Sequence, residues 1–210
     1  MASTETTTVA PSAASPRLFQ FDRTAFSGHH YDIKSVTETR SFYAGISSFT
    51  RKKPDLTLHE GTSDKGAIKA VCHMEHLRGN SKIGLGDPAK PDSVQWEDMT
   101  KESVFKASKY RWETALTNSS TPRRGREVLL WKRTQSVGVG GSSPSGLSVR
   151  NWKLVHEGTG EILAVFTSDG PLTKCEGLEV RANFGDAFDQ MVMITCLTLY
   201  EAAKRRGGGC

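Results

Sequence analysis

The sequence has no uninterrupted apolar run that would be long enough to cross a bilayer. Its longest apolar stretch, residues 191–200, is bounded by Asp189, Gln190 and Glu201, and apolar runs of about ten to fourteen residues are typical of core helices. An export signal is also lacking, and the four cysteines are scattered without a C-x-x-C pair. We therefore expect an intracellular, cytoplasmic protein with free thiols and no transmembrane segment.

Motifs of catalysis and nucleotide binding are lacking as well. There is no G-x-S-x-G motif, and the glycine-rich stretch 138–146 has neither the lysine of a P-loop nor a dinucleotide fingerprint, so we expect a flexible loop there. Cys72, His73, Glu75 and His76 are the one group with metal-ligand residue types, but their side chains alternate between the two faces of a strand. We interpret them as a buried cysteine with exposed histidines. The sequence thus predicts no enzyme, no metal site and no cofactor.

Length and composition predict one domain. The chain has 210 residues, of which 36% are hydrophobic, and can bury one substantial core. Residues 1–16 are rich in Thr, Ser, Ala and Pro and are predicted to form a disordered tail. The domain then covers residues 17–206, and 207–210 form a flexible C-terminal tail.

Short apolar or alternating runs, each bounded by Gly, Pro, Asp, Asn or Ser, predict about twelve strands. The candidate strands are 18–21, 31–36, 40–49, 55–60, 67–74, 82–85, 94–99, 104–107, 109–115, 127–134, 149–156, 162–167 and 178–184. In several of them one face is apolar and the other polar, which is typical of antiparallel sheet. The glycines at 158 and 160 predict a tight hairpin between 149–156 and 162–167.

The last strongly patterned stretch, 186–206, predicts a single helix without a polar face. Asp186 and Asp189 mark its beginning, and Lys204, Arg205 and Arg206 precede Gly207 at its end. A helix that is apolar all round has to be buried on every side. Its expected core residues are Phe188, Met191, Val192, Ile194, Cys196, Leu197, Leu199 and Tyr200.

The strands and the helix together favour one architecture. A sandwich with the helix packed on one side would leave half of the helix in water, which costs several kcal/mol at roughly 25 cal/mol per Å² of apolar surface. A sheet that closes around the helix removes its own edges and covers the helix completely. We therefore predict an α+β, mainly β fold: a closed antiparallel barrel of about twelve strands around a buried C-terminal hydrophobic helix.

Several segments resemble the tubby C-terminal-like superfamily, which includes the LURP-one-related proteins and the phospholipid scramblases. The matching segments are LLWKRT at 129–134, NWKLV at 151–155, GTGE at 158–161, ILAVF at 162–166 and LYEAAK at 199–204. A looser resemblance over residues 30–115 includes GLGDP at 84–88 and Trp96, which are similar to the fungal members. The resemblance implies a closed barrel around a buried C-terminal helix, and these segments are signatures of the fold and carry no chemistry.

Clusters of basic residues are the one positive indication of function. The net charge of +5 permits an anionic partner without requiring one. Basic loops can hold lipid headgroups or nucleic-acid phosphates through many weak contacts, although ordinary solvated surface has the same composition. The candidate anion-binding residues are Arg51, Lys52, Lys53, Arg123, Arg124, Arg126, Lys132 and Arg133.

The resemblance favours the lipid among these partners, because tubby domains recognise phosphoinositides through basic side chains on the barrel surface. We therefore expect a monomeric, non-enzymatic binding module that docks on anionic, phosphoinositide-containing membrane and is peripheral to it. An adaptor or nucleic-acid-associated regulatory protein that uses the same basic surface stays open as an alternative. The sequence leaves undetermined whether the basic clusters meet on one face.

Overall fold

The structure is a computed structural model that describes residues 15–23, 29–47, 53–75, 79–102, 109–115, 117–118, 121–122, 126–142, 150–168 and 175–207. Most of the predicted N-terminal tail, the predicted strand at 104–107 and the last three residues lie outside the described residues.

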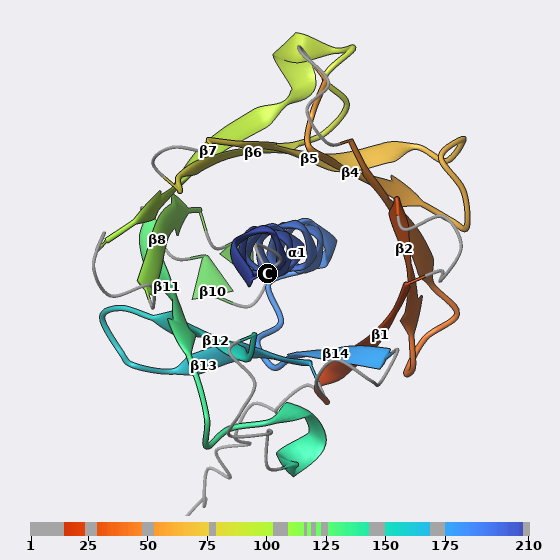
Figure 1. The fold of residues 1–210 in the computed structure, drawn as a ribbon. Coiled ribbons are helices and arrows are strands. Elements are labelled where there is room, and N and C mark those ends of the chain that lie inside the picture. Colours follow the sequence, from red (N-terminus) through yellow and green to blue (C-terminus); the bar gives the residue numbers. More distant parts are fainter. Residues whose placement is uncertain are drawn as a thin grey trace, which may run out of the picture.

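Twelve antiparallel strands close into one barrel, which confirms the predicted fold class (Figure 1). They are β1 (Arg17–Arg23), β2 (His30–Ser35), β3 (Ser41–Ile46), β4 (Leu56–Glu60), β5 (Ile68–Met74), β6 (Ser81–Leu85), β7 (Gln95–Lys101), β8 (Lys109–Thr114), β11 (Glu127–Arg133), β12 (Trp152–His156), β13 (Ile162–Ser168) and β14 (Cys175–Val180). The short strands β9 (Thr117–Asn118) and β10 (Thr121–Pro122) form a separate sheet. Each barrel strand pairs with the next one along the chain, and β14 pairs with β1 to close the ring.

The alternation of side chains gives the barrel its inner face. On β8, for example, Tyr110 and Trp112 are buried while Lys109 and Arg111 are only partly covered. The predicted hairpin is also confirmed, because β12 pairs with β13 and the chain turns through Gly160 at φ +71°. A positive φ of this size favours glycine.

Most strands begin or end a few residues from their predicted bounds, and β14 differs at both ends. We expected a strand over 178–184, but β14 runs from Cys175 to Val180. Beyond that point, the amides of Arg181 and Ala182 both donate to the carbonyl oxygen of Leu163, at 2.8 and 3.2 Å. Two amides that share one acceptor end the regular ladder, and the chain then turns through Gly185, at φ +83°, into the helix.

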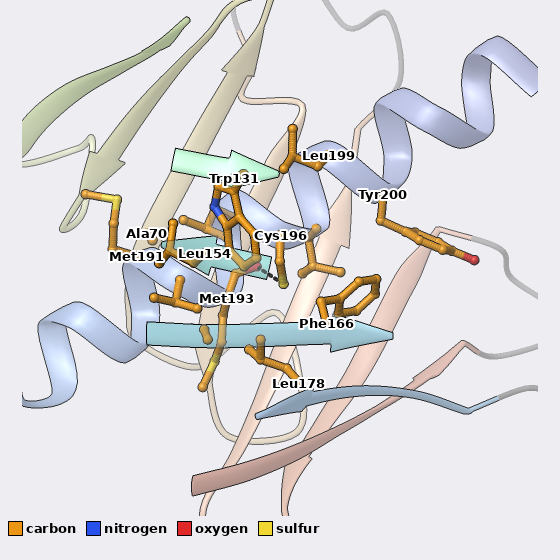
Figure 2. Packing of buried hydrophobic residues seen from close by; sticks show 14 of the residues in the cluster. Ala70, Trp131, Leu154, Phe166, Leu178, Met191, Met193, Cys196, Leu199 and Tyr200 are labelled. Atoms are coloured by element: carbon orange, nitrogen blue, oxygen red, sulfur yellow. Dashed lines mark hydrogen bonds between the residues drawn. The ribbon is translucent and has the colours of Figure 1, made fainter. Parts of the chain in front are cut away.

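The helix α1 (Asp186–Gly207) runs through the barrel, and the strands surround it (Figure 1). Its middle residues Val192, Met193, Ile194 and Leu197 have 0% exposed surface, and the expected core residues are all buried. Figure 2 shows side chains of the helix packed among those of the strands, with Trp131 and Phe166 among them. Because the ring covers all sides of the helix, no polar face is needed.

Two threonines lie within this apolar surface, and each satisfies its hydroxyl group inside the helix. The Thr195 hydroxyl donates to the Met191 carbonyl oxygen at 2.7 Å and accepts a hydrogen bond from the indole of Trp131 at 3.0 Å. The Thr198 hydroxyl donates to the Ile194 carbonyl oxygen at 2.7 Å. A buried hydroxyl without a partner would be costly, so these bonds explain how the helix tolerates both residues.

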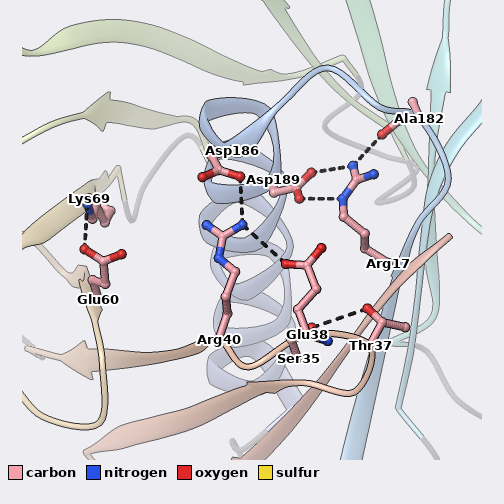
Figure 3. Close-up of polar contacts among 10 residues, drawn as sticks. All are labelled: Arg17, Ser35, Thr37, Glu38, Arg40, Glu60, Lys69, Ala182, Asp186 and Asp189. Carbon is pink, nitrogen blue, oxygen red and sulfur yellow. Dashed lines mark hydrogen bonds and ion pairs between the residues drawn. The ribbon is translucent and has the colours of Figure 1, made fainter. Parts of the chain in front are cut away.

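Two arginines outside the helix, Arg17 and Arg40, bind the carboxylates at the beginning of α1. Arg17 makes two hydrogen bonds of 2.7 Å to the carboxylate of Asp189 and a third, of 2.6 Å, to the Ala182 carbonyl oxygen (Figure 3). Arg40 contacts Asp186 at 2.7 Å. The first pair is buried and the second is largely exposed, so the Arg17 pair is the one that fixes the helix within the barrel.

Part of the predicted flexible loop packs on the barrel wall. The turn η2 (Val139–Gly141) lies against β14, where the Gly140 amide donates to Glu179 at 2.7 Å and Val139 lies over Gly177. Gly177 has no side chain, which lets Val139 approach the strand. A second turn, η1 (Pro91–Ser93), connects β6 to β7. Within the described residues, no helix combines the length and the apolarity that a bilayer crossing requires.

Candidate functional site

Aromatic side chains from the strands surround the last turns of α1. The Tyr31 hydroxyl donates to the carboxylate of Glu201, and the Tyr31 and Tyr200 rings meet edge to face at 6.1 Å. Farther around the barrel, the aromatic rings of Tyr110 and Trp152 are in contact, with their centres 5.7 Å apart. The barrel end at which the helix finishes is therefore closed by packed rings.

Arginines lie over these rings. The guanidinium carbons of Arg23, Arg133 and Arg150 lie 5.9, 4.6 and 5.5 Å from the ring centres of Tyr31, Trp152 and Tyr200. Cations at such distances are attracted by the ring faces, which restricts where their charges lie. We call the arginines at this end the arginine rim; they are Arg23, Arg133, Arg150, Arg205 and Arg206.

Part of the rim carries positive charge without a neutralising carboxylate. Arg205 contacts Asp55 at 3.4 Å, whereas Arg206 donates to the Tyr110 hydroxyl at 3.0 Å. Burial lowers the pKa of Arg133, and repulsion by the nearby Arg206 lowers this pKa further. Among the residues that the structure describes, neither Arg133 nor Arg206 has a carboxylate within salt-bridge distance.

Three lysines lie side by side on the outer wall near the rim. The register pairs Lys132 of β11 with Lys109 of β8 on one side and with Lys153 of β12 on the other. Lys109 contacts Glu102 at 2.5 Å, while the other two have no carboxylate partner within the described part of the chain. Like charges that face each other across strands destabilise a sheet, so this lysine row (Lys109, Lys132 and Lys153) costs stability in the free protein.

The cavity at this end is small. It has a volume of about 100 Å³ and lies beside Arg205 and Arg206, with Tyr110 and Met74 on its other walls. Pockets that enclose small molecules usually have volumes of ~300–1,000 Å³. The rim and the lysine row therefore form a charged surface that suits a ligand touching it from outside.

The structure describes four of the eight basic residues that the sequence predicted as a site, namely Lys53, Arg126, Lys132 and Arg133. Arg51, Lys52, Arg123 and Arg124 lie outside the described residues. Lys53 is exposed and precedes Asp55, which contacts Arg205 at the end of the helix.

Arg126 lies at the opposite barrel end. The next residue, Glu127, pairs with Thr114, which lines a cavity beside Phe188 in the first turns of α1. The described members of the two loop clusters, Lys53 and Arg126, therefore do not share a face. The remaining predicted residues, Lys132 and Arg133, belong to the lysine row and to the arginine rim.

Sequence reasoning missed most of the basic residues at this end: Arg23, Lys109, Arg150, Lys153, Arg205 and Arg206. A signal for the row was present, because each of its lysines is next to a large inward aromatic residue, in the pairs Lys109-Tyr110, Trp131-Lys132 and Trp152-Lys153. A residue next to an inward one faces outward. What was missing was the register, which places the three lysines opposite one another.

The thiols of Cys72 and Cys196 are buried, which makes them poor nucleophiles. Cys72 and Cys196 are unoxidised and fully buried, and the Cys72 sulfur lies 3.2 Å from the oxygen of the Thr198 hydroxyl, whose proton is donated to the Ile194 carbonyl oxygen. Burial raises the pKa of the Cys72 thiol to about 12. His73 lies on the opposite face of β5, where it contacts Trp96, and His76 lies outside the described residues. No group of metal-ligating side chains occurs among the residues that the structure describes.

We expect Cys72 to resist alkylation in the folded protein. At pH 8 a thiol of pKa about 12 contains roughly a thousandfold less thiolate than a free cysteine, and thiolate is the reactive form. The folded pKa is raised, so the stability that the neutral thiol contributes is complete below pH 9 and is lost as the pH rises toward about 12. Mass spectrometry after iodoacetamide treatment should find Cys72 modified only in denaturant; modification of the native protein at the rate of a free cysteine would contradict this assignment.

No protein-family model matches the chain, and a search of curated proteins finds no match. What is established is a closed twelve-stranded antiparallel barrel that surrounds a C-terminal helix and carries a basic surface where that helix ends.

Proposed function

We propose that the protein is a non-enzymatic binding module that docks reversibly on anionic, phosphoinositide-containing membrane. The docking surface consists of the lysine row, the arginine rim and Lys53, all at the barrel end where α1 finishes. The protein would then be intracellular and peripheral to the membrane. We further propose that it is a tubby C-terminal-like protein, as its sequence resemblance and its barrel with a central helix suggest.

The observation that carries this proposal is the lysine row beside the rim. Lys109, Lys132 and Lys153 face one another on three adjacent strands, which is unfavourable unless a negative partner neutralises them. Each lysine near an anionic membrane contributes ~1 kcal/mol. Arg133 and Arg206 add charge that is held in place by ring contacts and the Tyr110 hydroxyl. A charged surface whose cavity is only about 100 Å³ matches a layer of headgroups better than an enclosed ligand.

Replacing Lys109, Lys132 and Lys153 together with alanine should weaken binding to phosphoinositide vesicles by between tenfold and about a hundredfold. The loss stays below the full sum of three charges because Glu102 already neutralises part of Lys109. Vesicle sedimentation at about 0.15 M salt measures the effect, and binding of the unchanged protein should weaken steadily as salt is added.

The matched control replaces Lys34, Lys65 and Lys90, three exposed lysines at the opposite barrel end, and changes the net charge by the same amount. It should bind as the unchanged protein does. An equal loss of vesicle binding in both triple variants would mean that binding depends on the overall charge of the protein and not on the lysine row. Equal binding to neutral vesicles would contradict membrane docking, and a shift of nucleic acid in a gel at matched salt, without vesicle binding, would support the nucleic-acid alternative.

A further inference from the structure

The ladder between β7 and β8 is incomplete. The two strands pair only at Thr100 with Arg111 and at Lys101 with Tyr110, although both are described well beyond these pairs. On their other sides, β7 pairs with β6 as far as Gln95 and β8 pairs with β11 as far as Thr114. The regular ladder therefore has an opening between β7 and β8 toward the end at which α1 begins, although the two strands remain neighbours in the closed barrel.

A cleft of about 420 Å³ occupies this opening. We call it the β7–β8 cleft; its lining includes Trp96, Glu97, Asp98, Arg111, Glu113 and Arg126. Its volume falls within the range of ~300–1,000 Å³ that is typical of ligand sites. It differs in this respect from the small cavity at the rim.

A buried carboxylate lies at the bottom of the cleft. The Glu97 side chain is 3% exposed, although it belongs to a strand on the barrel wall. Its charge is balanced by Arg126, which is 51% exposed and reaches Glu97 from the start of β11. The same guanidinium group donates to the Glu113 carbonyl oxygen at 2.8 Å, which the β7–β8 ladder leaves unused. A cation that is half in solvent thus covers a carboxylate that is almost completely buried.

The remaining charges of the cleft favour a positively charged ligand. Without Arg126, the lining holds three carboxylates, those of Glu97, Asp98 and Glu113, and one cation, Arg111, which contacts Glu113 at 2.7 Å; Lys82, which pairs with Asp98 across the β6–β7 ladder, lies outside this lining. The wall attracts a second cation of the chain, because the ammonium group of Lys82 lies 5.3 Å from the ring centre of Trp96. In the free protein this surface thus already binds two cationic side chains, Lys82 and Arg126.

A buried donor in a residue that lines the cleft suggests what accompanies the cation. Trp112 contributes to the lining and is 1% exposed, and its indole N–H has no acceptor among the described residues. Buried donors normally have a partner. A ligand that combines a cation with a carbonyl group, as an arginine residue in a peptide does, offers a partner to both the carboxylates and this donor.

We propose that the β7–β8 cleft is a binding site for an arginine residue of a peptide partner, and that Arg126 occupies this site in the free protein. The incoming guanidinium group takes the place of Arg126 on Glu97 and on the Glu113 carbonyl oxygen. Arg126 is exposed enough to turn out into solvent when the ligand enters. This site lies at the barrel end opposite the lysine row and does not depend on membrane docking.

The test replaces Arg126 with alanine and uses N-acetyl-arginine amide as the probe. The change empties the site and leaves Glu97 uncompensated, so the probe should bind Arg126→Ala at least about tenfold more tightly than the unchanged protein. Binding of the probe should also raise the melting temperature of the Arg126→Ala variant. Tryptophan fluorescence can follow binding, because Trp96 and Trp112 line the cleft.

Two matched controls define the site. N-acetyl-glutamine amide, which lacks the charge, should have no effect, and the double variant Arg126→Ala/Glu97→Gln should not bind the arginine probe. If the Arg126→Ala variant does not fold by itself, we expect it to fold when the probe is added at millimolar concentration, and this result would support the site. Arg126→Lys, which keeps the charge, then provides a folded protein for the binding measurement.

Ethylguanidinium separates a peptide site from a site for any small cation. The structure assigns weaker binding to ethylguanidinium than to the probe, because it has no carbonyl group to accept from Trp112. Equal binding of the two would overturn the peptide assignment. Equal affinity of Arg126→Ala and the unchanged protein for the probe, or binding that survives Glu97→Gln, would overturn the site itself.

Discussion

Replacement of Ile194 by aspartate is expected to abolish cooperative folding. Ile194 is 0% exposed and lies at the middle of α1, where the barrel leaves no path to water. An ionised carboxylate there has no partner, and a buried unpaired charge costs several kcal/mol or more against a total stability of ~5–15 kcal/mol. The effect should therefore exceed that of any surface substitution.

Thermal unfolding followed by circular dichroism measures this effect. The conservative control Ile194→Val removes one methylene group and should cost only about 0.5–1.5 kcal/mol, with the transition still cooperative. If the Ile194→Asp variant remained soluble and melted in one sharp transition, the helix would not be buried on all sides.

The second large effect is expected for Arg17→Ala. Arg17 makes both of its bonds to Asp189 at 2.7 Å, and the Asp189 side chain is only 2% exposed. Removing one partner of a buried pair leaves the other charge uncompensated, which typically costs about 3–5 kcal/mol. Chemical denaturation at pH 7 should show a loss of this size. A loss below about 1 kcal/mol would contradict the role of this pair in fixing α1.

The neighbouring pair at the same helix end provides the matched control. Arg40 contacts Asp186 at the same distance of 2.7 Å, but the Asp186 side chain is 69% exposed. Exposed pairs contribute about 0–1 kcal/mol, so Arg40→Ala should destabilise the protein far less than Arg17→Ala. The two variants differ mainly in burial and share residue types and location.

The loss in Arg17→Ala should also depend on pH. Burial raises the pKa of Asp189 above its ordinary value, and the hydrogen bond from Arg17 opposes this only in part. A carboxyl with a raised folded pKa contributes stability at low pH, and that contribution is lost as the pH rises through the folded pKa. Without Arg17 the pKa rises further, so the loss should be largest near pH 7 and shrink as the pH falls toward about 4.

The fold could be predicted because several local patterns pointed to the same architecture. Alternation on strands such as β8 gave the inner face, and the stretch from Met191 to Tyr200 had no polar side to leave in water. Each pattern spans one element and is visible without knowledge of its neighbours. The end of β14 was predicted four residues too late, because the amides of Arg181 and Ala182, just after the strand, both bind Leu163, and such tertiary contacts leave no local signal.

The candidate sites depend on register and on residues far apart in sequence, which local patterns do not contain. Lys132 was singled out for its neighbour Arg133, whereas its importance comes from Lys109 and Lys153 on adjacent strands. Arg126 looked like a free loop charge, but the fold places it on the buried carboxylate of Glu97. Clusters along the chain are therefore a poor guide to clusters on the surface of a barrel, because neighbouring loops alternate between its two ends.

The central claim is that the barrel end where α1 finishes faces the membrane. It can be tested with single labels at two exposed serines, Ser136, three residues after Arg133, and Ser63, in the turn at the opposite end. Each serine is changed to cysteine in a chain whose Cys175 and Cys210 are serine, and a fluorophore is attached. On phosphoinositide vesicles that contain brominated lipid, quenching should be strong at position 136 and absent at position 63. Equal quenching at both positions, or quenching at 63 alone, would contradict the proposed orientation.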